Sequence, residues 1–223
     1  MDSDSHLEVS CPAKIKQCPI VDQLVGLQQE CRRLQDMIRR DSLTGYFNLR
    51  YLLEALSDEM ERTRRTGLPT GLIMIDIDHF KRINDTFGHE MGNQALKWCT
   101  SVWRNNIRRI DIPCRYGGEE FAIILPSTRL AQAVRAAERL RQAIATMPIH
   151  INETRVTLTA SFGVDVYTAK ESLEPKDFIT RADTFLLNAK EMGRNCVMYP
   201  GEGVEPASTE LTQEEREALF SKR

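Results

Sequence analysis

The sequence predicts an α/β (α+β) fold in which a central, mostly antiparallel sheet carries helices on its faces. Helical and strand patterns alternate from Asp41 onward, two apolar strand patterns flank a short glycine turn, and no internal repeat is present. The chain has 223 residues, of which 41% are hydrophobic. A chain of this length can bury a core without a metal ion or a disulfide.

The charge balance excludes several classes of function. A net charge of -2 argues against a nucleic-acid binder that works through bulk positive charge. No apolar stretch reaches the roughly 18 residues of a membrane span, and the acidic, polar N-terminus is the reverse of a secretory signal. The six cysteines are therefore expected to be reduced thiols. We expect a cytoplasmic protein with no membrane span and no nucleic-acid partner.

The first forty residues divide into two segments. Residues 1–19 show no helical or strand period and are expected to form a flexible tail, with a zinc site at Cys11 and Cys18 as the alternative. Residues 20–40 are expected to form a helical stem, because apolar side chains recur at intervals of four and three. These side chains are Ile20, Leu24, Leu27, Cys31, Leu34 and Ile38. The stem either dimerises as a short coiled coil or packs on its own domain.

The remaining elements follow in order along residues 41–199. Amphipathic periods and glycine or proline breaks predict helices at 48–65, at 79–105 with a break near 88–92, at 128–147 and at 176–192. Strands are expected at 71–78, on both sides of a hairpin turn at 116–119, within 155–167 and at 196–199. The segment 71–78 is nearly all apolar, which indicates a strand buried on both faces. Residues 200–223 are expected to be a mobile tail.

Carboxylates gather at the ends of two predicted strands. Asp76 and Asp78 end the first apolar strand, and Glu119 and Glu120 follow two glycines that permit positive φ and close approach of a ligand. Each pair alone is also typical of solvated acids. If the strands are neighbours, the acids repel one another unless divalent cations neutralise them. Oxygen ligands without a cysteine or histidine cluster favour Mg²⁺ or Mn²⁺, which usually serve phosphates.

Four ordered segments between residues 41 and 199 match one known family. They are Asp41-Ser42-Leu43-Thr44-Gly45, Asp76 to Lys81 with Asn84-Asp85 and Gly88-His89, Arg115-Tyr116-Gly117-Gly118-Glu119-Glu120-Phe121, and Ala182-Asp183 with Ala189 to Asn195. Together they resemble the GGDEF family, the diguanylate cyclases, in its GGEEF form. The resemblance implies a ferredoxin-like, polymerase-palm sheet. It also implies the condensation of two GTP into cyclic di-GMP with release of two pyrophosphates.

The resemblance implies roles for the clustered acids. Asp76, Glu119 and Glu120 would be catalytic. Together with the Ile77 carbonyl they would hold two Mg²⁺ or Mn²⁺ ions in each half-site. Such ions lower the pKa of an attacking 3′-hydroxyl and neutralise the α-phosphate. Glu120 would share a metal or help to remove the 3′-proton, whereas Asp78 is expected to be structural rather than a direct ligand.

The same resemblance implies a binding site for the triphosphate. The residues that match it are His79, Phe80, Lys81, Lys190 and Arg194. His79 and Phe80 begin a predicted helix, where free backbone N–H groups can meet phosphate. Lys190 and Arg194 are four residues apart and are therefore expected to share a helix face.

Guanine recognition is where this sequence departs from the family. Asn84 and His89 match the base-binding segment, but position 93 carries Asn where the family commonly has Asp. A carboxylate accepts from both guanine N1–H and N2–H₂, whereas an amide pairs one acceptor with a donor and so complements adenine. Guanine is expected to be favoured. The alternative is a cyclase of relaxed base choice that also makes cyclic GMP–AMP.

A further family feature precedes the hairpin. Arg108 and Asp111 fit an R-x-x-D pattern, and Arg139 matches a position that often completes this site from a neighbouring domain. The resemblance implies that cyclic di-GMP binds there and inhibits the enzyme. Because one domain presents one GTP, catalysis is expected to need a homodimer of half-sites. A non-catalytic module that senses cyclic di-GMP or GTP is a further alternative.

Overall fold

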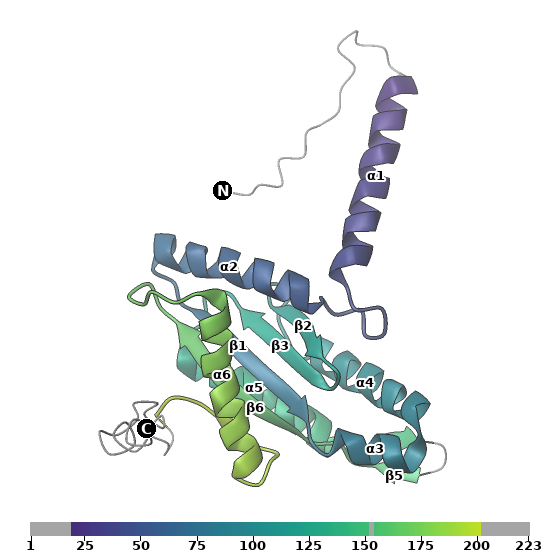
Figure 1. Cartoon of the computed structure of the whole chain (residues 1–223), viewed down its shortest axis with the longest axis vertical. Coiled ribbons are helices and arrows are strands. Elements are labelled where there is room, and N and C mark those ends of the chain that lie inside the picture. Colours follow the sequence, from purple (N-terminus) through teal and green to yellow (C-terminus); the bar gives the residue numbers. More distant parts are fainter. Residues whose placement is uncertain (1–18, 152–153, 202–223) are drawn as a thin grey trace, which may run out of the picture.

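The fold is that of a computed structural model, which describes residues 19–151 and 154–201 (Figure 1). The side chains at 29, 31–38 and 150–151 are not described. The tail expected over residues 1–19, with Cys11 and Cys18, lies outside the described residues except for Pro19. The tail expected from residue 200 onward lies outside them beyond Gly201.

A five-stranded sheet in the order β2-β3-β1-β6-β7 forms the centre of the domain. Its strands are β1 (Thr70–Ile77), β2 (Ile112–Gly117), β3 (Glu120–Leu125), β6 (Ala160–Tyr167) and β7 (Val197–Met198). β1 pairs antiparallel with β3 and β6, and β2 pairs antiparallel with β3. β7 runs parallel to β6. The predicted α/β fold with a mostly antiparallel sheet is confirmed.

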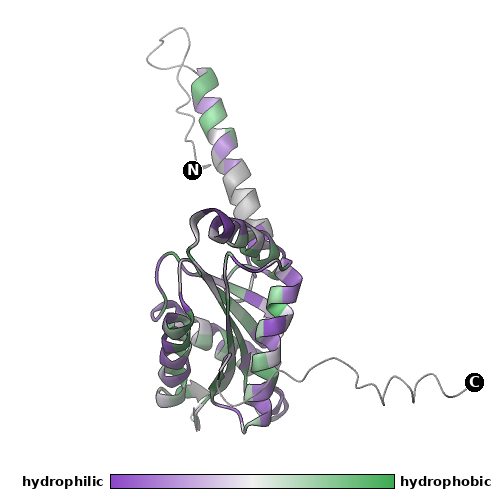
Figure 2. Ribbon diagram, turned by 90° about the vertical axis from the view of Figure 1, so that its left-hand side faces the viewer, coloured by the Kyte–Doolittle hydropathy of each residue, from purple (hydrophilic) through white to green (hydrophobic). Residues whose placement is uncertain are grey.

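Helices cover both faces of this sheet (Figure 2). One face is covered by α2 (Leu49–Thr66) and α6 (Pro175–Glu191), the other by α4 (His89–Arg104) and α5 (Leu130–Thr146), with α3 (Phe80–Phe87) packed on α4. Alternate residues of β1 enter the two cores, because successive side chains of a strand point to opposite faces. Ile73 and Ile75 pack with α4 and α5, and Leu72 and Met74 pack with α2 and α6. The strand predicted to be buried on both faces is therefore confirmed.

Local signals in the sequence set the helix ends. The Asn48 side chain caps α2 by accepting a hydrogen bond from the Tyr51 N–H, and Gly67 ends this helix at φ 74°. Gly88, at φ 85°, separates α3 from α4. Gly193, at φ 105°, follows the end of α6. These helix breaks agree with the sequence prediction.

Two details of the strands differ from the prediction. β4 (Ile149–Ile151) and β5 (Thr154–Val156) form a separate two-stranded sheet. β4 was not predicted, because three residues are too few to show a period. Gly117 and Gly118 permit positive φ, but neither glycine adopts it. The hairpin instead shifts register between Arg115 and Gly117.

The helix α1 (Pro19–Arg39) confirms the predicted helical stem and stands away from the sheet domain (Figures 1 and 2). Three seam residues have described side chains: Ile20, Leu24 and Leu27 are 67%, 45% and 64% exposed. They do not pack on the described part of the domain, so they leave an apolar surface for another helix. Dimerisation through this surface stays a prediction. Within the described ranges, no helix is both long and apolar enough to cross a membrane.

Candidate active site

The strand register brings two of the predicted acids face to face. Asp76 on β1 lies directly opposite Glu120 on β3. Opposite residues of antiparallel strands project from the same face of a sheet, and here α6 covers that face. The Ile77 N–H donates to the Glu119 carbonyl at 3.3 Å, which ties the hairpin to the end of β1. The two strand ends that carry the acids are therefore neighbours, as the sequence analysis expected.

Lys190 on α6 offsets part of this negative charge. Its Nζ lies 2.8 Å from Asp76 Oδ2. Burial raises the pKa of Asp76, although the hydrogen bond and charge of Lys190 oppose this shift. Burial also raises the pKa of Glu120, and the nearby charge of Asp76 raises it further. Two adjacent carboxylates on one face of the sheet repel each other when ionised, and a cation between them would offset this repulsion.

Gly163 on β6 lets α6 approach the sheet closely enough for Lys190 to reach Asp76. A Cβ atom at position 163 would lie 2.3 Å from the Ala182 carbonyl oxygen and 2.3 Å from the Leu186 nitrogen. Both atoms belong to the backbone of α6, so any other residue would push the helix outward. No local sequence signal marks this position, because the requirement arises only when α6 packs on β6.

The acids provide only oxygen donors, but their side chains are not all gathered at one point. The charge of Glu119 is close enough to raise the pKa of both Asp76 and Glu120. Across the described ranges, however, no three Asp, Glu, His or Cys side chains are grouped so that they could hold a metal ion. Carboxylate and carbonyl oxygens are the ligands that Mg²⁺ and Mn²⁺ prefer. The residues that the family resemblance assigns to such an ion are Asp76, Glu119, Glu120 and the Ile77 carbonyl.

Asp78 occupies a different environment from these acids. Its side chain is buried, and its carboxylate accepts three hydrogen bonds. The donors are Thr159 Oγ1 at 2.7 Å, Ser161 Oγ at 2.7 Å and the Asn195 N–H at 3.0 Å. A carboxylate engaged in this way is poorly placed to ligate a metal. The position matches the structural role that the sequence analysis expected.

The residues expected to bind phosphate at the start of α3 lie at the end of β1. His79 is the N-cap of α3 with φ 56°, and its side chain is exposed. The Phe80 side chain is buried in the core, so it does not meet a ligand itself. Lys81 is exposed. The Lys81 side chain is therefore open to an anion.

The expectation that Lys190 and Arg194 share a helix face is wrong. α6 ends at Glu191, and Arg194 follows Gly193 with φ 68° in a turn outside the helix. The Arg194 N–H donates to the Ala189 carbonyl at 3.0 Å, so the turn folds back onto the helix end. Gly193 was itself the sequence signal for this arrangement.

The residues expected to bind the base lie on α3 and α4. A Cβ atom at Gly92 would lie 1.9 Å from Asn84 Oδ1, so the Asn84 side chain lies against α4 one residue before Asn93. Asn84 and Asn93 are half-buried, and His89 is exposed at the first residue of α4. The structure therefore brings Asn84 close to the helix segment that carries the unusual Asn93.

The R-x-x-D residues lie between α4 and β2. A hollow of about 490 Å³ is lined by Arg40, Phe47, Arg104, Ile107, Arg108, Arg109, Asp111 and Pro113. Asp111 Oδ2 accepts a hydrogen bond from the Arg108 N–H at 2.7 Å, whereas the buried Oδ1 has no hydrogen-bond partner within the described part of the chain. Burial raises the pKa of Asp111, although Arg108 and Arg139 oppose the shift.

Arg139 on α5 lies beside this segment within the same domain. Its Nε and Nη2 both donate to the Asn106 carbonyl, at 3.0 Å and 2.8 Å. The structure thus places Arg139 near the R-x-x-D residues of its own chain. In the family resemblance, this position often completes the site from a neighbouring domain instead.

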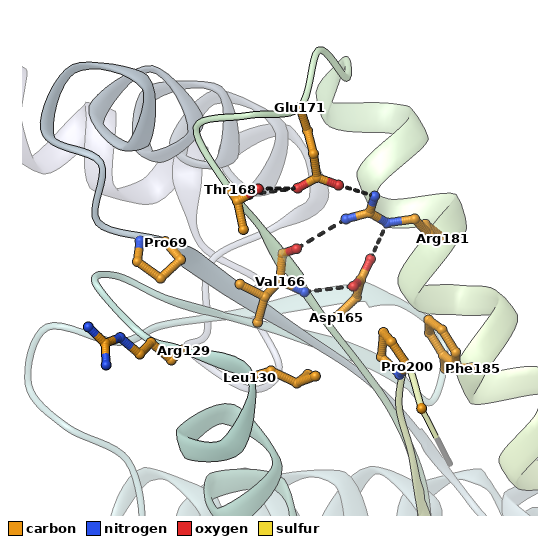
Figure 3. A pocket seen from close by; sticks show the side chains of 11 residues that line it. Pro69, Arg129, Leu130, Asp165, Val166, Thr168, Glu171, Arg181, Phe185 and Pro200 are labelled. Carbon is orange, nitrogen blue, oxygen red and sulfur yellow. Dashed lines mark hydrogen bonds and ion pairs between the residues drawn. The ribbon is translucent and has the colours of Figure 1, made fainter. Parts of the chain in front are cut away.

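A second cavity, of about 600 Å³, lies at the end of β1 opposite to Asp76 (Figure 3). It includes none of the residues that the sequence analysis assigned to a site. Its wall contains Arg181, which donates to Asp165, to Glu171 and to the Val166 carbonyl. In this wall the positive charge of Arg181 is therefore paired with two carboxylates.

Comparison with known proteins identifies the class of domain. The chain matches the family described as "Diguanylate cyclase, GGDEF domain" over residues 38–196. It is 43% identical over 160 residues to the response regulator PleD of Caulobacter vibrioides, which covers 71% of this chain and 35% of PleD. It is 41% identical over 155 residues to the diguanylate cyclase DgcP of Pseudomonas aeruginosa, which covers 70% of this chain and 23% of DgcP.

The chain therefore belongs to the GGDEF family of diguanylate cyclase domains. It spans about a third or less of the length of these two curated relatives. The sequence resemblance to this family is confirmed.

Solved structures agree with this assignment. The coiled coil and GGDEF domain of DgcB from Caulobacter crescentus, in complex with c-di-GMP, matches with a TM-score of 0.74 and 26% identity, covering 81% of this chain and 95% of that one. The diguanylate cyclase SiaD of Pseudomonas aeruginosa, in complex with its activator SiaC, matches with a TM-score of 0.72 and 36% identity, covering 81% and 69%. The fold expected from the family, with a helix before the domain, is confirmed.

Proposed function

We propose that this chain condenses two GTP molecules into cyclic di-GMP and releases two pyrophosphates. The observation that carries the proposal is the pairing of Asp76 with Glu120 across β1 and β3, beside Lys190. It supports a site where anionic substrate oxygens meet cations. The metal-binding acids and phosphate-binding cations that the family resemblance requires are all present in this sequence: Asp76, Glu119, Glu120, Lys190 and Arg194.

Asp76, Glu119, Glu120 and the Ile77 carbonyl would hold Mg²⁺ or Mn²⁺, two ions in each half-site. When bound, such ions lower the pKa of the attacking 3′-hydroxyl and neutralise the α-phosphate. Glu120 takes the proton from that hydroxyl. Asp76, on the neighbouring strand β1, lies across the site from Glu120.

The phosphates are bound by the cations around the same strand ends. Lys190 moves from Asp76 to a phosphate oxygen when the negative charge of Asp76 is neutralised. Lys81 and Arg194 bind further phosphate oxygens, and both side chains are exposed. The backbone N–H groups of His79 and Phe80, at the start of α3, complete the phosphate site.

Asn84, His89 and Asn93 recognise the base. The Asn93 amide oxygen accepts one guanine N–H, and guanine is the preferred base. A cyclase of relaxed base choice is a second candidate, because the Asn93 NH₂ group is a donor where guanine also presents donors. Only this residue favours the second candidate.

The reaction needs two half-sites that face each other in a two-fold dimer. The exposed apolar residues Ile20, Leu24 and Leu27 support dimerisation through α1. A stem joined in this way raises the effective concentration of one domain near the other.

Cyclic di-GMP inhibits the enzyme at Arg108, Asp111 and Arg139. The buried Asp111 Oδ1 without a hydrogen-bond partner in the described chain supports a ligand that donates N–H groups, as guanine does. The arginines that line the same hollow supply the charge to bind phosphate.

Incubation of the protein with GTP, ATP and Mg²⁺, followed by mass spectrometry, tests this proposal. Cyclic di-GMP as the main product supports it, and a large share of cyclic GMP–AMP would establish relaxed base choice instead. Nucleotide that binds without turnover would identify a sensing module. The Asp76→Asn variant, checked for native folding by circular dichroism, is the control for a contaminating cyclase.

A further inference from the structure

We propose that Asp78 is a positioning residue that holds the turn at 193–195 and thereby aims Arg194 at the triphosphate. The proposal rests on the proposed function, because it takes Arg194 to be a phosphate ligand. Asp78 itself touches neither substrate nor metal.

The Asp78 carboxylate joins three segments that are distant in the sequence. Its Oδ1 accepts from Ser161 Oγ, and its Oδ2 accepts from Thr159 Oγ1 and from the Asn195 N–H. The Asp78 N–H also donates to the Thr159 carbonyl at 2.9 Å. The end of β1, the start of β6 and the turn after α6 therefore meet at one buried side chain, which is 5% exposed.

The turn that carries Arg194 needs such a restraint. Gly193, Arg194 and Asn195 have φ values of 105°, 68° and 46° in succession. A non-glycine residue with positive φ has an energetic cost and persists where surrounding contacts hold it. One contact is the Asn195 N–H on Asp78. The other is Arg141 Nη1, which donates to the Asn195 side chain at 2.9 Å and to its carbonyl at 3.2 Å.

These contacts act on the backbone on one side of Arg194. The Arg194 N–H is held on the other side by the Ala189 carbonyl at the end of α6. The direction of the guanidinium therefore depends on a backbone that is fixed at both of its peptide bonds. Loss of the Asp78 contact leaves the turn attached through α6 and Arg141 but removes its tie to β1, the strand that carries Asp76.

The hydrogen-bond pattern distinguishes positioning from metal binding. In an Asp78→Asn variant the amide oxygen can still accept from Thr159 and Asn195. The amide NH₂ can donate to Ser161 Oγ, whose hydroxyl rotates to accept. The exchange therefore preserves the contacts of a positioning residue. A direct metal ligand would lose its charge and most of its affinity for the ion.

Steady-state kinetics with GTP test this inference in Asp78→Asn, Asp78→Ala and Asp76→Asn. We expect Asp78→Asn to stay within about threefold of the parent, whereas Asp78→Ala raises KM for GTP by about tenfold with a smaller change in kcat. Asp76→Asn, the matched exchange two residues away, loses cyclase activity. Loss of activity in Asp78→Asn to the level of Asp76→Asn would overturn the inference.

A double-mutant cycle with Arg194→Ala identifies the residue through which Asp78 acts. If Asp78 works by aiming Arg194, the double variant Asp78→Ala/Arg194→Ala has about the same KM as Arg194→Ala alone. If the two single substitutions instead multiply in their effects on KM, the inference is contradicted. The melting temperature of each variant separates a change in KM from unfolding. Asp78→Asn serves as the conservative variant that should restore the parent KM.

Two further measurements separate this inference from the proposed function. The first is the affinity of the same variants for a nonhydrolysable GTP analogue. A parent that binds the analogue but makes no product would overturn the cyclase assignment. The affinities of the variants would still decide the role of Asp78. Amide hydrogen exchange at Asn195 should be faster in Asp78→Ala than in Asp78→Asn. Equal exchange in the two variants would contradict the proposed contact.

Discussion

The Arg115 guanidinium lies 3.0 Å from the Asp41 carboxylate and also donates to the Gly118 carbonyl, at 2.7 Å from Nη2 and 3.1 Å from Nε. One side chain thus connects the segment that follows the stem with the glycine hairpin that carries Glu119 and Glu120.

Replacement of Arg115 should therefore affect catalysis although the residue lies outside the acidic pair. We expect Arg115→Ala to lower kcat roughly tenfold or more, because the hairpin loses a fixed contact with its support. Arg115→Lys keeps the charge but not the forked geometry, so it should restore little. An Arg115→Ala enzyme with the kcat of the parent would show that the hairpin is held without this residue.

The same ion pair predicts how stability depends on pH. Burial raises the pKa of Asp41, but hydrogen bonds from Thr44 and Arg115 outweigh it and hold the pKa below its usual value. A lowered pKa in the folded state stabilises the protein above the unfolded pKa of about 4, and this contribution is lost as the pH falls below it. The difference in melting temperature between the parent and Asp41→Asn should thus be larger at pH 7 than at pH 3. An equal difference at both pH values would count against the pair.

Gly163 offers a test of how α6 is placed. Gly163→Ala should destabilise the fold by about 1–3 kcal/mol, because the added methyl group meets the backbone of α6. It should also lower cyclase activity by moving Lys190 away from Asp76. Thermal unfolding and product formation provide the two measurements.

Gly26→Ala is the matched control for this change. A Cβ atom at Gly26 meets nothing within 4 Å, and alanine is the better helix former. This variant should not lose stability. If Gly163→Ala were as stable and as active as Gly26→Ala, the close approach of α6 would have no role.

Base choice depends on Asn93 in this account. Asn93→Asp should raise the preference for GTP over ATP, because a carboxylate accepts from both guanine N–H groups. The ratio of cyclic di-GMP to mixed product, measured with equal GTP and ATP, reports the change. An unchanged ratio would mean that the base is selected elsewhere, with Asn84 as the next residue to test.

Much of the domain could be predicted from the sequence because the signals are local. Continuous apolar residues indicated that β1 is buried on both faces, and glycines marked the ends of α2, α3 and α6. The acids could be placed near one another because they follow strands that are expected to be neighbours. Arg194 differs from the expectation because Gly193, between it and Lys190, ends the helix that their four-residue spacing would require.

The features that were not predicted arise from contacts between distant residues. Asp78 and Asn195 are 117 positions apart, and Asp41 and Arg115 are 74 apart. No local pattern reports such a contact. Gly163 is of the same kind, since its need to be glycine depends on a helix that lies later in the chain.

The decisive measurement is cyclic di-GMP formation from GTP and Mg²⁺ by the parent and by Glu120→Gln, alongside the affinity of each for a nonhydrolysable GTP analogue. We predict that the parent makes cyclic di-GMP and that Glu120→Gln binds the analogue but forms no product, because the base opposite Asp76 is missing. Product formation by Glu120→Gln at the rate of the parent would contradict the paired carboxylates as the catalytic centre.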